Sequence, residues 1–190
     1  SVFLILKSLE KNVVFFQSPS EIKILSERDN FVVNIKKKTE QKTISIFVDV
    51  QNVYYTSRQA FKRNFNYNKF WSMVTKDRKI LNAIAYATHR NDKKQIEFQN
   101  ILRAIGFKVK LKPYITRADG TAKADWDVGI AIDVMELAET SDIIILVSGD
   151  GDFDQLLNRI KDKYNVECEV YSVKSLTSKS LIDEATRYYP

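Results

Sequence analysis

Three aspartates lie within five residues in the segment SGDGDFD, which covers residues 148–154 and follows the apolar run IIILV. Carboxylates crowded in this way repel each other unless a cation lies among them. Their hard oxygen ligands suit Mg²⁺ or Mn²⁺. Zinc is not expected, because His89 is the only histidine and Cys168 the only cysteine. The segment therefore predicts a divalent-metal site, provided that acids from elsewhere in the chain join it.

Two other segments carry acids in a similar position. Asp49 closes the apolar run ISIFV, and Asp125 and Asp127 stand at the start of a predicted helix over 125–139. Runs without a polar residue indicate central strands, because only a strand covered on both faces tolerates them. In open α/β sheets, ligands bind at the carboxyl ends of the strands, where the strand order reverses. If the two apolar strands are neighbours, the acids converge there.

Each aspartate also has a simpler explanation. Asp150 and Gly151 form a turn dipeptide, and Asp152 could cap the helix that begins near residue 153. Capping explains any one residue well, but acids from separate segments at one predicted edge favour a metal site. The candidate ligands are Asp49, Asp127, Asp150 and Asp152. Asp154 fits better as an acid in the first turn of a helix, and Asp133, which faces another side of its helix, is expected either to be structural or to support the metal ligands.

Strand and helix patterns alternate from Ile44 onward. The predicted strands cover residues 44–48, 80–88, 107–113, 143–147 and 166–173. The predicted helices cover 52–65, 68–74, 92–106 and 125–139, with one more after residue 153 and a last one carrying Leu181, Ile182, Ala185 and Tyr188 on one side. Strands separated by helices imply parallel pairing through right-handed crossovers. We therefore expect an α/β fold with helices on both faces of the sheet.

The first 43 residues differ in sequence pattern from the rest of the chain. Short apolar or alternating runs are separated by SPSE and ERDN, which indicates a small β extension. The charged stretch KKKTEQKT then places a boundary near Thr43. We expect an N-terminal extension over 1–43, whose role the sequence does not indicate, and a main domain over 44–190.

Composition and charge bear on the kind of partner and on the cellular compartment. The chain has 190 residues, 44% of them hydrophobic, and a formal charge of +6, which weakly favours a polyanionic partner but equally fits an ordinary lysine-rich protein. Cys168 lies in the alternating stretch VECEV as a small core residue, and such cysteine usage suits a reducing, cytoplasmic compartment. The opening run SVFLIL is too short to span a bilayer, so we expect no membrane or secretion signal. The sequence leaves a homodimer open.

The motifs FVDVQN, KADWDVGIAIDVM and LVSGDGDF, in this order and separation, resemble the NYN domain of the PIN-like nuclease superfamily, and within it the LabA-like group. The resemblance covers roughly residues 44 to 190. It implies a three-layer α/β/α fold with a mainly parallel central sheet. It also implies a divalent-metal site, which many relatives use to hydrolyse RNA.

Matched to this sequence, the acids of the family fall on Asp49, Asp127, Asp150 and Asp152, with Asn52 and Ser148 as supporting polar groups. We therefore expect a Mg²⁺- or Mn²⁺-dependent endoribonuclease. The alternative is a regulatory or nucleic-acid-binding module that keeps the acidic pocket without turnover. A phosphatase of the haloacid-dehalogenase type is disfavoured, because Asp49 is followed by VQN rather than by a second aspartate.

Basic and aromatic groups near the acids are candidates for RNA contacts. Lys123 and Arg117 precede Asp127, and Arg58 lies in the first predicted helix with Lys62 and Arg63. Trp126 and Tyr54 lie beside the proposed acids and could stack on unpaired bases. A solvated surface charge is the simpler role for each cation, and core packing is the simpler role for at least one of the aromatic residues.

Overall fold

A computed structural model describes residues 13–18, 21–26, 31–36, 41–89, 92–113, 115–116, 122–123 and 125–190. The chain divides into two compact units, Ser1–Glu40 and Gln41–Pro190. The first unit contains a three-stranded antiparallel sheet, which confirms the predicted β extension. Its strands are β1 (Val13–Ser18), β2 (Glu21–Ser26) and β3 (Phe31–Lys36).

The second unit is built on a six-stranded parallel sheet with the order β11-β10-β9-β4-β5-β6. Its strands are β4 (Thr43–Asp49), β5 (Lys79–His89), β6 (Lys108–Pro113), β9 (Ile143–Val147), β10 (Glu167–Tyr171) and β11 (Arg187–Tyr189). Two short strands, β7 (Ile115–Thr116) and β8 (Ala122–Lys123), form a separate antiparallel pair.

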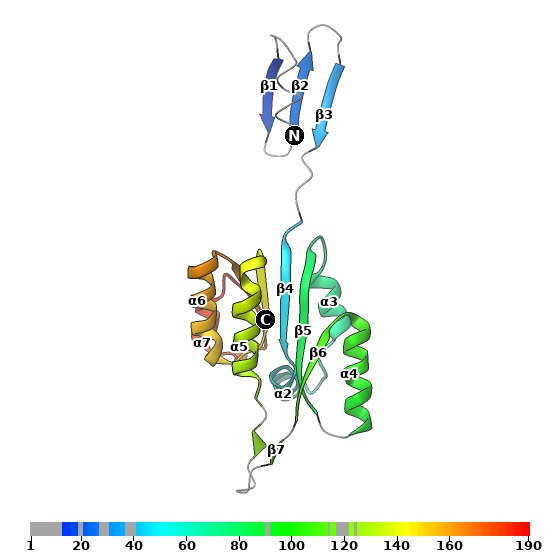
Figure 1. The fold of residues 1–190 in the computed structure, drawn as a ribbon, viewed down its shortest axis with the longest axis vertical. Coiled ribbons are helices and arrows are strands. Elements are labelled where there is room, and N and C mark those ends of the chain that lie inside the picture. The colour runs from blue at the N-terminus through cyan, green and yellow to red at the C-terminus, as the bar shows by residue number, and fades with distance from the viewer. Residues whose placement is uncertain are drawn as a thin grey trace. The chain divides into compact units, whose positions relative to one another are not determined.

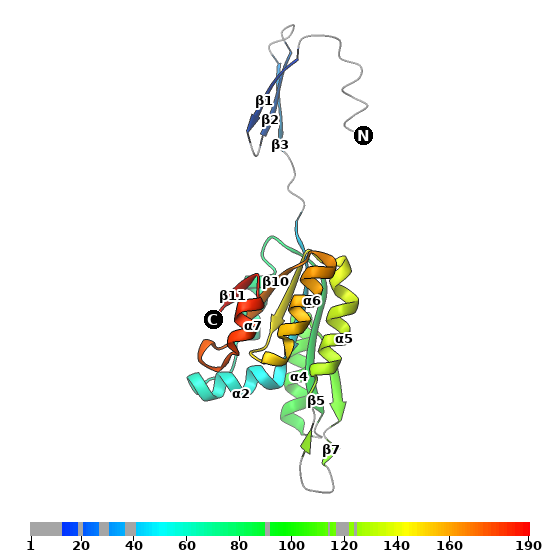
Figure 2. The same cartoon turned by 90° about the vertical axis from the view of Figure 1, so that its left-hand side faces the viewer.

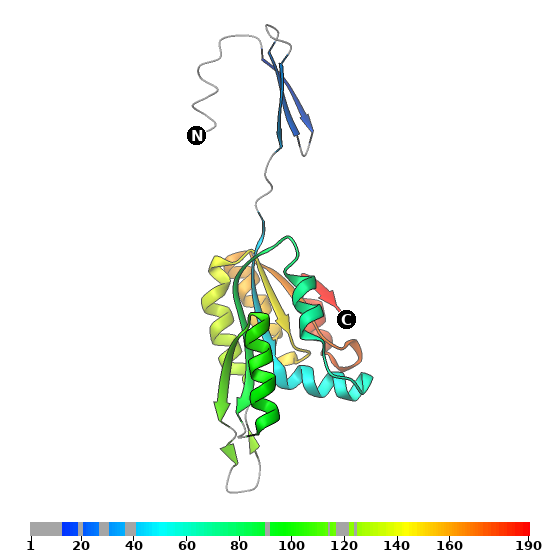
Figure 3. The same cartoon turned by 90° about the vertical axis from the view of Figure 1, so that its right-hand side faces the viewer.

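Helices cover both faces of the sheet, so the fold has the expected three α/β/α layers (Figure 1). One face packs on α2 (Val50–Phe61), α3 (Tyr67–Val74) and α4 (Lys93–Ile105), seen in Figure 3. The other packs on α5 (Asp127–Leu137), α6 (Asp154–Tyr164) and α7 (Lys179–Glu184), which lie in front of the sheet in Figure 2. Three 3-10 turns complete the unit: η1 (Ala138–Thr140), η2 (Gly151–Phe153) and η3 (Lys174–Leu176).

The two apolar runs ISIFV and IIILV form adjacent central strands, as predicted. Ile44 pairs with Ile143 and Val48 with Val147, so β4 and β9 run side by side in parallel. Their side chains are buried because one core cluster lies on each face of the sheet. From β4 the chain proceeds to β5 and β6 on one side, and from β9 to β10 and β11 on the other. The strand order therefore reverses between β4 and β9, and the residues that follow these strands meet there.

The last element differs from its prediction. The helix α7 ends at Glu184, and Tyr188 lies in β11, paired in parallel with Val170 of β10. The backbone of Ala185 is extended, with φ −67° and ψ 136°, which ends the helix. The aromatic pair in Arg187–Tyr189 suits a strand, and pairing with β10 outweighs the helical spacing of the apolar residues.

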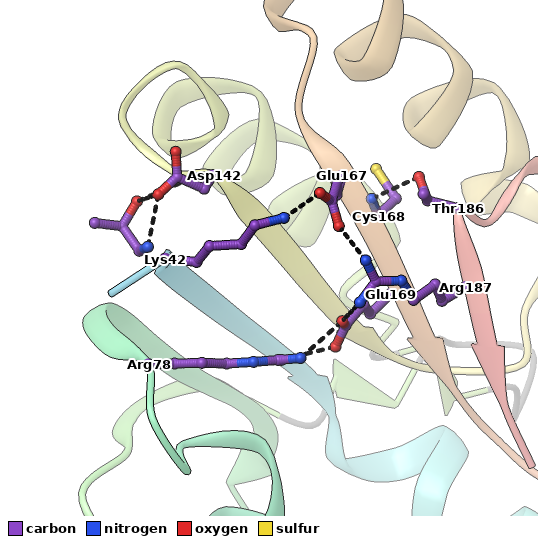
Figure 4. Close-up of polar contacts among 9 residues, drawn as sticks. Lys42, Arg78, Asp142, Glu167, Cys168, Glu169, Thr186 and Arg187 are labelled. Atoms are coloured by element: carbon purple, nitrogen blue, oxygen red, sulfur yellow. Dashed lines mark hydrogen bonds and ion pairs between the residues drawn. The ribbon is translucent and has the colours of Figure 1, made fainter. Parts of the chain in front are cut away.

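The amino edge of the sheet is held by ion pairs (Figure 4). Lys42 and Arg187 both contact Glu167 at the start of β10, the Arg187 pair at 2.9 Å. Arg78 donates two hydrogen bonds of 2.8 and 2.9 Å to Glu169, a fully buried carboxylate. Glu167 and Glu169 at this edge are therefore paired with cations.

No helix in the part of the chain that the structure describes is long and apolar enough to cross a lipid bilayer.

Candidate metal site and its surroundings

The four candidate acids reach one place from three separate segments. Asp49 is the last residue of β4 and the N-cap of α2, where its side chain accepts a 3.0 Å hydrogen bond from the backbone N–H of Asn52. Asp127 is the first residue of α5. Asp150 follows β9 and caps η2, which contains Asp152. All four therefore lie at the carboxyl edge of the sheet, where the strand order reverses.

The carboxylates lie close enough to share a cation. One oxygen each from Asp127, Asp150 and Asp152 lie within 4.8 Å of one another. Asp127 and Asp150 are half-buried, whereas Asp152 is exposed. With Asp49, the first two line a pocket of about 240 Å³. The other residues that line this acidic pocket are Gln51, Asn52, Tyr55, Thr56, Asp125 and Trp126.

The electrostatics of Asp49 show an excess of negative charge. Burial raises the pKa of its carboxyl group to about 6, since only 7% of the residue is exposed. Burial is the largest cause of this net value, to which the charges of Asp127 and Asp150 also contribute upward, against the lowering effect of backbone N–H groups at Asn52 and Gln51. At the opposite edge, a hydrogen bond from Lys42 lowers the pKa of Glu167. The carboxyl edge thus carries the charge imbalance that a cation would relieve, and its all-oxygen donor set fits Mg²⁺ or Mn²⁺.

Neutral groups hold the acidic loop in shape. The side-chain oxygen of Asn52 accepts a 3.1 Å hydrogen bond from the backbone N–H of Gly149, which ties α2 to the loop after β9. Ser148 is fully buried, and its hydroxyl accepts from the backbone N–H of Asp150 at 3.3 Å. A carboxylate oxygen of Asp150 accepts in turn from the N–H of Asp152 at 3.1 Å. Asn52 and Ser148 therefore support the loop backbone.

The start of α5 is positioned by two contacts with the sheet. The indole N–H of Trp126 donates to the carbonyl of Ala87 at 2.9 Å, and its ring packs on Tyr86 at a centroid distance of 5.3 Å. One turn and a half further on, Asp133 pairs with Lys110 at 2.6 Å and accepts from the hydroxyl of Tyr86 at 2.5 Å. Asp133 therefore anchors α5, in agreement with its expected structural role.

The cations predicted to contact RNA are not seen at the acidic pocket among the described residues. Arg58 is exposed on α2 but does not line the acidic pocket. Arg117 lies outside the described residues, and of Lys123 only the backbone is described, where it pairs with Ile115. These residues stay predictions.

Sequence reasoning named Trp126 and Tyr54 as stacking candidates. Trp126 lines the acidic pocket, but Tyr54 does not, and its neighbour Tyr55 does so instead. The signal was present in the sequence, because Asn52, Tyr55 and Thr56 are spaced three and four residues apart and so share one face of a helix.

Cys168 offers no competing chemistry. It is fully buried in β10, and burial raises the pKa of its thiol to about 12, which keeps it protonated at neutral pH. Its backbone N–H donates to the hydroxyl of Thr186. Cys168 is a core residue, as its alternating sequence context indicated.

Comparisons with known proteins agree with this geometry. Residues 43–190 match the NYN domain family. A curated relative, the low amplitude and bright protein LabA of Synechococcus elongatus, is 26% identical over 156 residues, covering 76% of this chain and 81% of the relative. The crystal structure of a protein of unknown function from Vibrio parahaemolyticus is similar with a TM-score of 0.76 and 52% identity, covering 80% of this chain and 94% of that chain.

Proposed function

The chain belongs to the NYN domain family, as a LabA-like member of the PIN-like nuclease superfamily, and from this premise we propose that it is a divalent-metal-dependent ribonuclease. Its reaction would be the hydrolysis of phosphodiester bonds in RNA. One observation carries the proposal: carboxylate oxygens of Asp127, Asp150 and Asp152 lie within 4.8 Å of one another, beside the buried Asp49.

The site fits a hard divalent cation. Asp127, Asp150 and Asp152 would hold Mg²⁺ or Mn²⁺, with the buried Asp49 as a fourth carboxylate that lines the acidic pocket. When bound, such an ion neutralises charge on the phosphoryl oxygens, lowers the pKa of a water molecule and stabilises the leaving alkoxide.

The other residues of the site keep the acids in place and receive the substrate. Asn52 and Ser148 fix the loop that carries Asp150, so that little reorganisation is needed when the cation binds. Tyr55 and Trp126 line the acidic pocket and present aromatic surface to an unpaired base. No side chain needs to act as a covalent nucleophile, because a water molecule attacks the phosphorus atom.

Cleavage of a fluorescent single-stranded RNA tests the proposal. We expect the wild type to cleave with Mn²⁺ and to stop when EDTA is added. Asp150→Asn should lower the rate by at least about 100-fold, since it removes a carboxylate from the cluster. Asp162→Asn, an exposed acid on α6, is the matched control and should cleave like the wild type. Equal rates for Asp150→Asn and the wild type would contradict the assignment.

A regulatory module that keeps the acidic pocket without turnover is the second candidate, since the name of the curated relative states no enzymatic activity. Mn²⁺ binding without cleavage of any RNA in a varied panel would favour it. A cytoplasmic location and a homodimer stay predictions, which cell fractionation and sedimentation would test.

A further inference from the structure

An apolar groove opens beside the acidic pocket and is larger than it, with a volume of about 810 Å³. We name it the α2–α3 groove, and its aromatic lining consists of Phe61, Phe65, Phe70, Tyr171 and Tyr189. This volume lies in the range of pockets that take a small organic group. The groove needs an occupant of similar size and partly apolar character.

The C-terminal half of α2 exposes apolar side chains to this groove. The sequence predicts one helical stripe containing Val53, Ser57, Ala60 and Phe61, and the first two are buried. Ala60 and Phe61 are exposed instead, Phe61 to 63%, and both line the α2–α3 groove. The stripe therefore continues past the core as open apolar surface.

The aromatic floor of the groove is held rigidly. The rings of Tyr171 and Tyr189 stack with a centroid distance of 4.5 Å and an interplanar angle of 12°, and Phe70 packs edge-on against Tyr171 at 5.3 Å. The hydroxyl of Tyr171 donates to the buried Glu169 at 3.2 Å, and Arg78 holds that carboxylate (Figure 4). A pre-formed floor lowers the entropic cost of binding a flat ligand.

The groove carries cations and no acidic side chain among the described residues that line it. Its cations are Arg63, Lys69 and Lys174, from the loop after α2, from α3 and from η3. All three are exposed, and none forms an ion pair with another residue that the structure describes. Aromatic surface bordered by cations is the combination that binds single-stranded nucleic acid.

The groove also continues into the proposed catalytic site. Asn52 and Thr56 line both the α2–α3 groove and the acidic pocket. A ligand that occupies the groove would therefore contact Asn52 and Thr56, two residues that also line the pocket of Asp49 and Asp150.

We propose that the α2–α3 groove binds a base of single-stranded RNA, while Arg63, Lys69 and Lys174 hold the flanking phosphates and lead the strand across Asn52 and Thr56 to the acids. This inference rests on the proposed ribonuclease function and adds to it the strand type and the path of the substrate. The apolar lining selects an unpaired base, because a paired base would keep its faces stacked within a duplex.

Binding is measured on the full chain in EDTA, so that cleavage does not interfere, by the fluorescence anisotropy of labelled hexauridylate. We expect it to bind at least about tenfold more tightly than an abasic ribose-phosphate chain of the same length, because stacking contributes to each base bound. The double variant Arg63→Gln/Lys69→Gln should weaken binding and reduce the slope of log K against log salt by about 1.4, or about 0.7 for each lost phosphate contact.

The matched control is Lys94→Gln/Arg159→Gln, which removes the same net charge from exposed positions outside the groove. It should change the affinity by less than about twofold, because distant surface charges are screened. Photo-crosslinking of a hexamer that contains 4-thiouridine should label peptides that line the groove, within residues 52–73 or 171–190.

The proposal would be overturned if the abasic chain bound as tightly as hexauridylate, or if the control variant lost as much affinity as the groove variant. Crosslinks confined to segments that do not line the groove would also overturn it. So would a dimer that buries the groove and excludes hexauridylate, as shown by sedimentation velocity. If RNA binds in this way but is never cleaved, the ribonuclease proposal is wrong and the base-binding role of the groove stands. If RNA is cleaved but its binding does not depend on the bases, the base-binding role of the groove is wrong and the ribonuclease proposal stands.

Discussion

Asn52 and Gly149 join the two halves of the acidic site through one hydrogen bond, in which the Gly149 backbone N–H donates to the Asn52 side-chain oxygen at 3.1 Å. Asn52 lies one turn after Asp49, and Gly149 directly precedes Asp150. The bond therefore sets the separation of two carboxylates that are 101 residues apart in the chain. A neutral amide does this without adding charge to the acidic pocket.

Asn52→Ala removes this bond and leaves the Gly149 N–H without its acceptor. We expect a loss of about 1 kcal/mol in the free energy of unfolding. Mn²⁺ affinity should fall by about tenfold, as is typical when a group that supports metal ligands is lost. Urea unfolding and calorimetric Mn²⁺ titration measure the two effects. Gln59→Ala, at an exposed position of the same helix, should change neither, and an equal loss in that control would rule out this role.

Two acids of α5 should respond differently to the same substitution. Asp127→Asn removes a carboxylate from the cluster, so Mn²⁺ affinity should fall by at least about tenfold. Asp133→Asn should leave this affinity within about twofold, because Asp133 is engaged by Lys110 and Tyr86. It should instead cost about 1–3 kcal/mol of stability. If both variants bound Mn²⁺ equally weakly, the division between ligand and anchor would be wrong.

Asp49 makes the stability of the metal-free protein depend on pH. Its pKa is about 6 in the folded chain against an ordinary value of 3.8, so the folded state holds this proton more tightly than the unfolded state. Between about pH 4 and pH 6 the free energy of unfolding therefore falls as pH rises, by up to about 3 kcal/mol. Asp49→Asn should thus be more stable than the wild type at pH 7 in EDTA.

At pH 4 the side chain at position 49 is uncharged in the folded wild type as well as in the folded Asp49→Asn variant. The greater stability of Asp49→Asn should therefore largely disappear. Urea unfolding curves at the two pH values measure the difference directly. A variant that is no more stable than the wild type at pH 7 would show that Asp49 carries no such electrostatic cost.

The ion pairs at the amino edge differ in burial, and their contributions to stability should differ with it. Arg78→Met leaves the fully buried Glu169 with the 3.2 Å hydrogen bond from the Tyr171 hydroxyl and the 3.5 Å contact from Arg187, and should cost about 3–5 kcal/mol. Lys42→Met breaks a pair between an exposed lysine and a half-buried glutamate that also pairs with Arg187, and should cost at most about 1 kcal/mol. Thermal unfolding measures both, and similar losses would contradict the dependence on burial.

Much of the metal site follows from the pattern of strands. The runs that end at Val48 and Val147 are apolar except for Ser45, which identified them as central strands, and the acids after them were expected at one edge. The adjacency of β4 and β9 confirmed that expectation. The rule that ligands bind where strand order reverses therefore predicted that acids remote from one another in the sequence lie close together in the fold.

Other features depend on tertiary pairing that the sequence does not show. Tyr188 continues the helical spacing of Leu181, Ile182 and Ala185, whereas the adjacent Tyr188 and Tyr189 also suit a strand, and pairing with the edge of β10 decides between them. The α2–α3 groove was missed because Ala60 and Phe61 continue the buried stripe of α2 without a break. Whether a neighbouring element covers that stripe is a property of the packed structure.

The central claim is that Asp49, Asp127, Asp150 and Asp152 form a divalent-metal site. Anomalous diffraction from crystals soaked in Mn²⁺ tests it directly, because the signal locates the ion without reference to activity. We predict a peak among the carboxylates of Asp127, Asp150 and Asp152, at the mouth of the pocket that Asp49 lines. A map with no peak there, or with Mn²⁺ bound only at other places, would contradict the account.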